Sequence, residues 1–277
     1  MRQRVKLLTI DLDDTLIGQD LVVSPRNRAA IRRAVRAGII VTLATGRTFS
    51  TTQPFAQRLG LHHTLACFQG ALLRGKHKIL TSRTMPPQFY LDIIKFGLRH
   101  KVQQCVYALD HDTVYFQRPL NTFGKEYLDR IEQVRQISLV NLVSYPFPHP
   151  PIKVMFITSP EKVVKLEAMA KRKWGDALYI TQTRANLLEF LHPQVNKGFA
   201  LRYLANHYHL PLSQTAAIGD GHNDIPMLET AGVSFAVRNA PRVVEAAADH
   251  VVAAWDQDGV AEAIDWILAH QPKRTKK

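Results

Sequence analysis

The sequence predicts a doubly wound α/β core, that is, a parallel sheet with helices on both faces, interrupted by an α+β insert. Near both ends of the chain, short apolar runs alternate with helical patterns, which predicts the core. Several of these runs lead directly into polar residues, as strands do at the ligand-binding edge of an α/β sheet. Between residues 85 and 189 the pattern changes to paired strands. We therefore expect a core of residues 1–84 and 190–277, with residues 85–189 as an inserted α+β domain.

The first elements of the core follow from apolar runs and capping residues. Residues 5–10 form an apolar run that predicts a buried strand. Ser24 and Pro25 supply an N-cap and a first-turn proline for a helix that ends at Gly38. Residues 39–43 predict a second buried strand, and another helix follows it. Strand, helix, strand and helix in this order indicate a parallel sheet.

The insert shows different local signals. The prolines at 86–87 open a helix. Residues 104–108 and 113–116 alternate around a polar turn at 111–112, which predicts a β-hairpin. The other expected elements are helices near 123–133 and 160–174, strands near 152–158, 178–181 and 187–191, and a rigid proline-rich loop at 145–151.

The parallel pattern resumes after about residue 196. A short apolar run at 216–218 predicts a buried strand that leads into Gly219-Asp220-Gly221. The chain is completed by helices near 198–207, 225–230 and 260–269 and by a strand at 233–237.

Composition excludes some classes of protein. With 46% hydrophobic residues, 277 residues suffice for a sizeable core and for more than one domain. No apolar run approaches the roughly 20 residues of a membrane span, and the short run after the basic N-terminus does not fit a secretory signal. We therefore expect a cytoplasmic protein without a membrane partner, with Cys67 and Cys105 as reduced packing residues.

The charge balance is basic. Lysine and arginine outnumber aspartate and glutamate by 36 to 23, a formal net charge of +13. Such a balance is compatible with nucleic acid, an anionic surface or acidic small substrates. The basic residues are spread over helical faces at 26–36 and 162–173 and a tail at 273–277, and no zinc-finger or RNP-type motif accompanies them. We therefore expect solvated helix faces, a tail dispensable for chemistry and no nucleic-acid partner; the oligomeric state is not predicted.

Polar residues follow three of the predicted core strands, at 11–15, 45–47 and 219–224. Because parallel strands end at the same edge of a sheet, these residues should face one crevice. Several carboxylates that converge there repel one another and need a cation. Oxygen ligands without supporting cysteine or histidine favour Mg²⁺. A divalent cation, a hydroxyl, a lysine and backbone N–H groups at helix starts together predict a phosphate site.

The order of these motifs resembles one known family. Asp11-Leu12-Asp13-Asp14-Thr15 is similar to the first motif, DxDxT, of the haloacid-dehalogenase-like (HAD) hydrolases, which have a Rossmann-like core. Thr45, Lys197 and Gly219-Asp220-Gly221-His222-Asn223-Asp224 resemble their second, third and fourth motifs. The segments 225–228 and 231–233 resemble the Cof-type branch, phosphatases with a large α/β cap between motifs two and three. The predicted insert lies at that place in the chain.

The resemblance implies specific roles. Asp11 would be the nucleophile that forms a phosphoaspartyl intermediate. Asp13 would protonate the leaving alcohol and then deprotonate the water that hydrolyses the intermediate. The implied Mg²⁺ ligands are Asp11, Asp13 through its backbone carbonyl, and Asp220, with Asn223 and Asp224 as alternate ligands or as supports of the ligands. The implied phosphate- or substrate-binding residues are Thr45, Gly46, Arg47, Lys197 and Asn223, with Arg47 equally able to pair with a core carboxylate.

Three positions depart from the branch's common pattern. Gln69 replaces a common asparagine and Arg238 a usual glycine, and both are expected near the entrance of the site, where they would affect substrate choice. Asp14 replaces a frequent glycine. The expected function is Mg²⁺-dependent hydrolysis of phosphate monoesters of small metabolites, such as sugar phosphates, with the cap selecting the substrate. The alternatives are a sugar phosphomutase, a sucrose-phosphate-type phosphatase and a non-catalytic basic binding protein.

Overall fold

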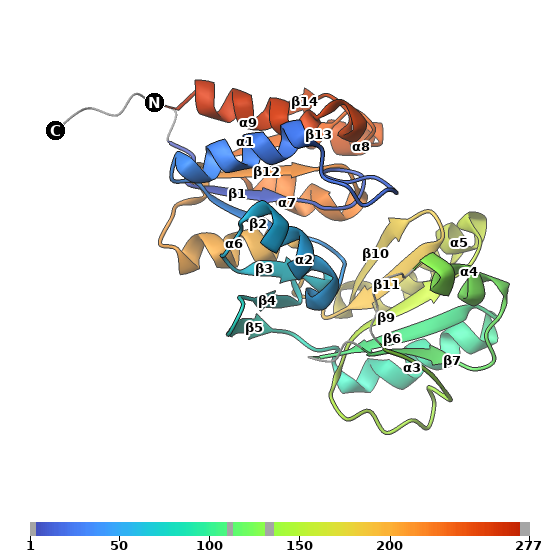
Figure 1. Cartoon of the computed structure of the whole chain (residues 1–277). Coiled ribbons are helices and arrows are strands. Elements are labelled where there is room, and N and C mark those ends of the chain that lie inside the picture. The colour runs from blue at the N-terminus through green and yellow to red at the C-terminus, as the bar shows by residue number, and fades with distance from the viewer. Residues whose placement is uncertain (1–3, 110–112, 131–135, 272–277) are drawn as a thin grey trace. The chain divides into compact units, whose positions relative to one another are not determined.

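The structure is a computed structural model that describes residues 4–109, 113–130 and 136–271. Its contacts divide the chain into two compact units (Figure 1), Met1–Leu80 with Asn196–Lys277, and Thr81–Val195. These bounds differ by a few residues from the predicted core and insert. The predicted hairpin turn at 111–112, the end of the predicted helix at 123–133 and the basic tail at 273–277 lie outside the described residues.

The first unit is built on a five-stranded parallel sheet. Its strand order is β14-β13-β12-β1-β2, and its strands are β1 (Leu7–Ile10), β2 (Ile40–Leu43), β12 (Thr215–Gly219), β13 (Val233–Val237) and β14 (His250–Val252). Figure 1 shows α1 (Pro25–Arg36) and α9 (Gly259–Ala269) on one face, and α6 (Lys197–His207) and α7 (Ile225–Thr230) on the other. The predicted doubly wound α/β core is therefore confirmed.

The strand β1 carries apolar side chains on both of its sides, which explains why helices cover both faces of the sheet. Leu7, Leu8 and Ile10 are all fully buried, although successive side chains of a strand point to opposite faces. Leu7 packs in one cluster with Leu201 and Met227 from α6 and α7. A strand that is apolar on both sides needs a cover on both sides, and the sheet is therefore buried between two helical layers.

The direction of winding reverses beside β1. From β1 the chain moves to β2 on one side, and it later returns to β12 and continues through β13 and β14 on the other side. The registers pair Ile10 with Leu43 of β2 and with Ile218 of β12, so the three strands end level with one another. A reversal of this kind leaves a crevice at the carboxyl ends of the strands, which is where open α/β sheets bind ligands.

Local signals set the bounds of the predicted helices. Ser24 caps α1, since its side chain accepts a hydrogen bond from the N–H of Asn27, and Gly38 follows the helix with a φ of +82°. Thr48 caps α2 (Phe49–Leu59) by accepting from the N–H of Thr51. Both caps satisfy donors that the first helical turn leaves unpaired.

Several short elements of the first unit, one of which extends past its boundary at Leu80, were not predicted. They are the small sheet of β3 (Leu65–Cys67), β4 (Leu72–Arg74) and β5 (Ile79–Ser82), the strand β14 and the helix α8 (Arg242–Glu245). Each has only three or four residues, too few for a periodic pattern to form. The β3 strand matters for the site, because Ala66 pairs with Ala44 directly after β2.

The second unit is a six-stranded sheet, mixed in direction, in the order β10-β11-β9-β6-β7-β8. The predicted hairpin strands, β6 (Gln103–Ala108) and β7 (Thr113–Gln117), pair antiparallel, whereas β7 and β8 (Gln136–Val140) pair parallel. The other strands are β9 (Pro151–Ile157), β10 (Tyr179–Arg184) and β11 (Leu187–Leu191), and the helices are α3 (Pro87–Arg99), α4 (Thr122–Arg130) and α5 (Pro160–Trp174).

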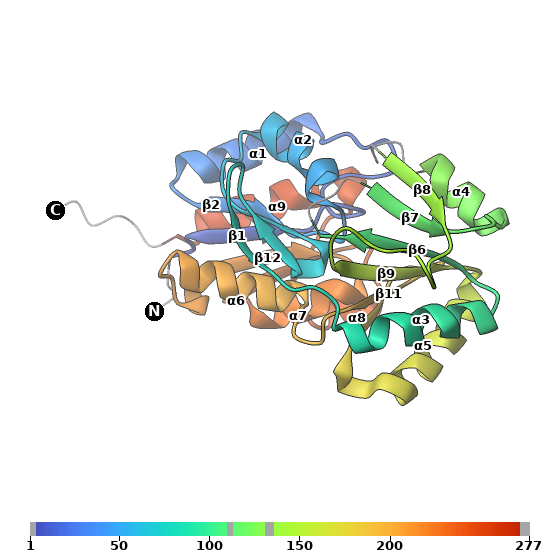
Figure 2. The same cartoon turned by 90° about the horizontal axis from the view of Figure 1, so that it is seen from below.

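Helices cover both faces of this second sheet. Gln104 of β6 lies against Gly97 of α3, whereas its neighbour Gln103 lies against Gly124 of α4. Since adjacent residues of a strand point in opposite directions, α3 and α4 lie on opposite faces. Figure 2 shows α3 and α5 side by side, and their residues Ile93 and Leu166 belong to one apolar cluster. The expected α+β character of the insert is thus confirmed.

No helix within the described parts of the chain combines the length and the hydropathy that are needed to cross a membrane.

Candidate active site

Asp11 lies at the carboxyl end of β1. It follows Ile10, and its N–H donates to the carbonyl of Ile218 at 2.9 Å, so that the pairing of β1 with β12 extends one residue beyond the strand. Asp220 follows the end of β12 at Gly219. The two aspartates therefore leave adjacent parallel strands at the point where the winding reverses, as the sequence predicts.

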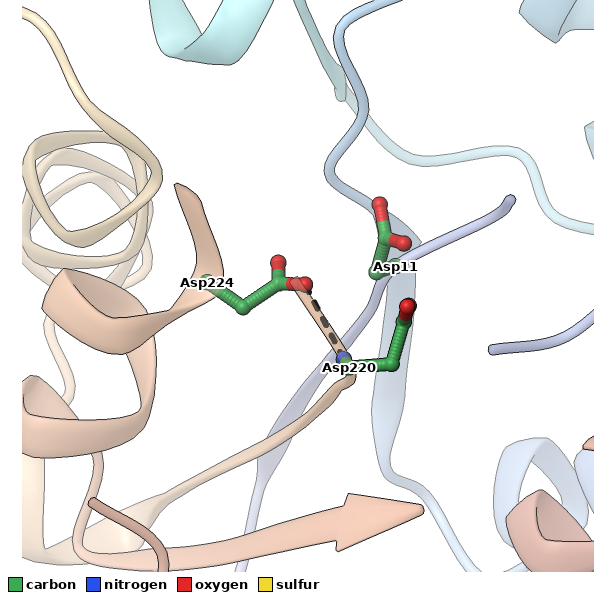
Figure 3. A group of neighbouring side chains, drawn as sticks. All are labelled: Asp11, Asp220 and Asp224. Atoms are coloured by element: carbon green, nitrogen blue, oxygen red, sulfur yellow. Dashed lines mark hydrogen bonds between the residues drawn. The ribbon is translucent and has the colours of Figure 1, made fainter. Parts of the chain in front are cut away.

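Three carboxylates meet at this edge of the sheet. Figure 3 shows the side chains of Asp11, Asp220 and Asp224 together, and each offers an oxygen within 4.8 Å of the others. Asp11 is 5% exposed and Asp224 is fully buried. Asp224 is fixed by the backbone, because its Oδ2 accepts from the N–H groups of Asp220 at 3.1 Å and Gly221 at 2.9 Å. Thr15 holds the third carboxylate, since its hydroxyl donates to Oδ1 of Asp220 at 2.5 Å.

Lys197 supplies the positive charge of this cluster. Its Nζ donates to Oδ1 of Asp11 at 2.5 Å and to Oδ1 of Asp224 at 2.7 Å, and the residue is 1% exposed. Burial by itself lowers the pKa of Lys197, but the charges of Asp11 and Asp224 outweigh it and hold that pKa well above the ordinary value. Lys197 therefore stays charged.

The start of α6 determines where Lys197 points. The side chain of Asn196 caps the helix by accepting from the N–H of Phe199 at 2.7 Å. Gly198 then allows α6 to approach α7 closely, since a Cβ at Gly198 would lie 2.3 Å from the carbonyl oxygen of Pro226. A larger residue would push the helix, and Lys197 with it, away from the aspartates.

The cluster has less positive charge than negative charge. Burial, and next the charge of Asp224, raise the pKa of Asp11 well above its ordinary value, although Lys197 lowers it. Burial, with a further contribution from Asp224, raises the pKa of Asp220 to about 7, although the hydrogen bond from Thr15 opposes this. A single lysine thus does not neutralise three aspartates, and the folded protein holds protons there that the unfolded chain would release.

This donor set fits a hard divalent cation. The cluster consists of carboxylates alone, and an oxygen-only set is the one that Mg²⁺ and Ca²⁺ take in proteins. A bound cation would also supply the positive charge that the cluster lacks.

We expect the metal-free protein to lose stability as the pH rises. The folded-state pKa of Asp220, about 7, lies above the ordinary value of 3.8. Between these values the folded state binds more protons than the unfolded state, so the free energy of unfolding should fall as pH rises through this window and level off above it. Added Mg²⁺ should raise the melting temperature at pH 8 but hardly at pH 5.

Thermal unfolding with EDTA and with Mg²⁺, at several pH values, measures this prediction. The matched control is Asp220→Asn, in which the contribution of Asp220 to the slope should disappear. An equal effect of Mg²⁺ on the melting temperature at pH 5 and pH 8 would show that these carboxylates do not hold the cation.

Asp13 is held by an arginine. Arg47 donates to both carboxylate oxygens of Asp13, from Nε at 2.8 Å and from Nη2 at 2.6 Å, in the bidentate geometry that favours strong pairing. Of the two roles left open for Arg47, the structure shows the pairing with a core carboxylate. The hydroxyl of Thr45, buried at 1% exposure, accepts from the N–H of Arg47 at 3.2 Å.

Asn223 and Gln69 form a hydrogen bond across the site. Nδ2 of Asn223 donates to Oε1 of Gln69 at 2.9 Å, and Gln69 is 1% exposed. The side chain of Gln69 is therefore buried between loops beside the fourth motif, and its expected effect on substrate choice stays a prediction. Arg238, at the end of β13, is exposed.

Some residues of the site were missed from the sequence. Thr15 had no predicted role, although its place in the first motif was a usable signal. Asp14 has a φ of +60°, and Asn239 fixes this turn by donating to its carbonyl at 2.8 Å. The positive φ explains why glycine is frequent at this position, and aspartate is among the residues that tolerate it best.

Comparison with known proteins shows the family. The family model for haloacid dehalogenase-like hydrolases matches residues 8–264, nearly the whole chain. The chain belongs to the haloacid dehalogenase-like hydrolases. The predicted family is therefore confirmed, together with the prediction that the protein is an enzyme.

The chain is also similar in sequence or structure to individual HAD-like hydrolases. The chain is 28% identical over 288 residues to the 5-amino-6-(5-phospho-D-ribitylamino)uracil phosphatase YwtE of Bacillus subtilis, with 96% of this chain and 99% of that protein covered. A haloacid dehalogenase-like hydrolase from B. subtilis has a similar structure, with a TM-score of 0.83 at 25% identity over 94% of this chain and 99% of that one. The HAD subclass IIB sugar phosphatase BT4131 shares the fold, with a TM-score of 0.82 at 21% identity over 95% and 98% of the chains.

Proposed function

We propose that this HAD-like hydrolase is a phosphatase that hydrolyses phosphate monoesters of small metabolites through a phosphoaspartate on Asp11. One observation carries the proposal: Asp11 lies at the switch point of the sheet, bonded to the buried Lys197, and the second aspartate of the same motif is held by Arg47. Two aspartates with separate partners can take separate roles, nucleophile and acid–base catalyst, and Asp13 would carry a proton only after one of its oxygens exchanges Arg47 for the ester oxygen.

The proposed reaction has two steps. In the first, a carboxylate oxygen of Asp11 bonds to phosphorus while the bond from phosphorus to the ester oxygen breaks, and Asp13 gives its proton to the leaving alcohol. In the second, water attacks the phosphorus of the acyl phosphate and gives a proton to Asp13. Inorganic phosphate leaves and Asp11 is restored.

Mg²⁺ is the proposed cofactor. Asp11, Asp220 and Asp224 would hold it, with the backbone carbonyl of Asp13 and with Asn223 as a further or alternate ligand. When bound, the cation would neutralise the repulsion between the carboxylate of Asp11 and the phosphate that it attacks.

The phosphoryl oxygens would be held by groups of the loop after β2 and of the start of α6. Lys197 supplies a full charge, Thr45 a hydroxyl whose oxygen already accepts from Arg47, and Gly46 a backbone N–H. Arg47 would orient Asp13 and lie near enough to contact the phosphate. Charge develops on these oxygens in the transition state, so donors fixed in advance lower the barrier.

The proposed substrates are small phosphorylated metabolites, with sugar phosphates as the first class to test. The substrate named for YwtE carries a phosphorylated ribityl chain, and BT4131 is named a sugar phosphatase. Residues 85–189 would select among such substrates. The proposed setting is the cytoplasm, which the two buried free cysteines, Cys67 and Cys105, support.

A screen of phosphorylated metabolites with Mg²⁺ tests the proposed function, with released phosphate as the readout. We expect phosphate release from several sugar phosphates. Transfer of the phosphoryl group to a second sugar, without free phosphate, would instead indicate a phosphomutase, and activity confined to sucrose phosphate would indicate a sucrose-phosphate-type phosphatase.

Removal of the metal should abolish turnover. Because the cluster offers oxygen ligands alone, EDTA should stop phosphate release and added Mg²⁺ should restore it. Full activity after exhaustive EDTA treatment, with no metal found by elemental analysis, would refute the metal requirement. Zn²⁺ should restore less activity than Mg²⁺, since the cluster has no nitrogen or sulfur ligand.

A further inference from the structure

The loop after β3 has an unusual backbone. Phe68, Gln69 and Gly70 follow one another with φ values of +49°, +58° and +94°. A positive φ in the left-handed region destabilises a residue that has a side chain by roughly 1–2 kcal/mol. Phe68 and Gln69 have side chains, and Gly70 does not. Such a conformation persists only where its surroundings hold it, and it often marks a functional site.

Backbone bonds tie this loop to the second motif. The N–H of Gln69 donates to the carbonyl of Thr45 at 3.0 Å, and the N–H of Phe68 donates to the carbonyl of Arg47 at 3.0 Å. The loop also abuts the cap of α6, since a Cβ at Gly70 would lie 2.7 Å from the carbonyl oxygen of Asn196. The left-handed turn thus brings the loop against two of the segments that carry the proposed phosphate ligands.

The side chain of Gln69 reaches the fourth motif. Its Oε1 accepts from Nδ2 of Asn223 at 2.9 Å. Its Nε2 lies over Gly46, where a Cβ would come within 2.4 Å of it. One buried amide therefore fills the space that Gly46 leaves open and holds Asn223 from a position 154 residues away in the sequence.

We propose that Gln69 is a positioning residue that fixes the spacing between the loop of Thr45 and Gly46 and the loop of Asn223. The proposal rests on the proposed function, in which the loop of Thr45 and Gly46 holds the phosphoryl group and Asn223 is a further or alternate ligand of Mg²⁺. An asparagine at position 69 would be one C–C bond shorter, about 1.5 Å, and could not keep the 2.9 Å contact without a shift of the loops. The glutamine of this chain thus acts on the reacting end of the substrate, and not on its specificity.

Two predictions separate this role from a role in substrate choice. Gln69→Leu and Gln69→Asn should lower kcat/KM by about 10–100-fold, since small misplacements of ligands at a reacting centre have effects of this size. The loss should be the same for an aryl phosphate and for a sugar phosphate. In a double-mutant cycle with Asn223→Ala, the double variant should lose no more than the worse single variant, because both substitutions break one contact.

The test measures kcat/KM on both substrates and the melting temperature for wild type, Gln69→Leu, Gln69→Asn, Asn223→Ala and the double variants. Gln57→Asn, on the exposed face of α2, is the matched control and should match wild type. Independent losses that multiply in the double variant, a changed ratio between the two substrates, or no loss at all would each overturn the proposal. Phosphate release by the wild type tests the proposed function separately. The melting temperatures of the single and double variants show whether Gln69 and Asn223 interact, even if the protein has no activity.

Discussion

Asp11→Asn is expected to lower turnover on every phosphate monoester by on the order of 10⁴-fold or more, the size of loss seen when an enzyme loses its covalent nucleophile. The amide is a poor nucleophile, and it removes one of the three charges that would hold Mg²⁺. Steady-state phosphate release measures the loss. Asp20→Asn, an exposed aspartate in the loop after β1, is the matched control and should keep full activity.

The same variant should fold at least as stably as wild type in the absence of metal. Burial and Asp224 raise the pKa of Asp11 well above its ordinary value, which means that the charged form is unfavourable in the folded protein. An amide of nearly the same shape removes that penalty. A melting temperature far below that of wild type at pH 8 in EDTA would mean that the loss of activity reflects unfolding, and the assignment of the nucleophile would lose its support.

Asp13→Asn is expected to lower kcat by about 10²–10⁴-fold, the usual contribution of general acid–base catalysis. The loss in the first step should be smaller for an aryl phosphate than for an alkyl phosphate, because a phenolate leaves without a proton. The second step should be slow with both, since the water that attacks still needs a base. Single-turnover kinetics on the two substrates separate the steps.

Asp14→Asn is the matched control for this variant. It changes the adjacent carboxylate to the same amide, and asparagine tolerates the positive φ of that position. A loss as large as that of Asp13→Asn would mean that the general charge of the first motif, and not a proton on Asp13, produces the effect. A loss that is equal for aryl and alkyl phosphates in the first step would also argue against Asp13 as the acid.

The sequence predicts much of the core because local signals there agree with the long-range fold. The apolar runs before Asp11 and Asp220 mark where two strands end, and the N-cap at Ser24 marks where α1 begins. Once the strands are known to be parallel, their carboxyl ends must meet at one edge. The proximity of Asp11 and Asp220 then follows from topology alone.

The rest depends on contacts that have no local pattern. The burial of Gln69 arises from three consecutive positive φ values and from a partner 154 residues away. From the sequence, Arg47 could either bind phosphate or pair with a core carboxylate. Only the side-chain geometry shows that it pairs with Asp13. The strands β3 and β14 are too short for periodicity to reveal, so the loop of residues 68–70 could not be placed from the sequence.

Trapping the phosphoenzyme shows whether Asp11 carries the phosphoryl group during turnover. Wild type, Asp13→Asn and Asp11→Asn are mixed with an aryl phosphate and Mg²⁺, quenched rapidly in acid, and weighed by intact-mass spectrometry with the site mapped to a peptide. We predict a transient phosphoryl group on Asp11 in wild type, its accumulation in Asp13→Asn, and none in Asp11→Asn. Phosphorylation of another aspartate in Asp11→Asn, or phosphate release without any phosphoenzyme in wild type and Asp13→Asn, would show that Asp11 is not the nucleophile.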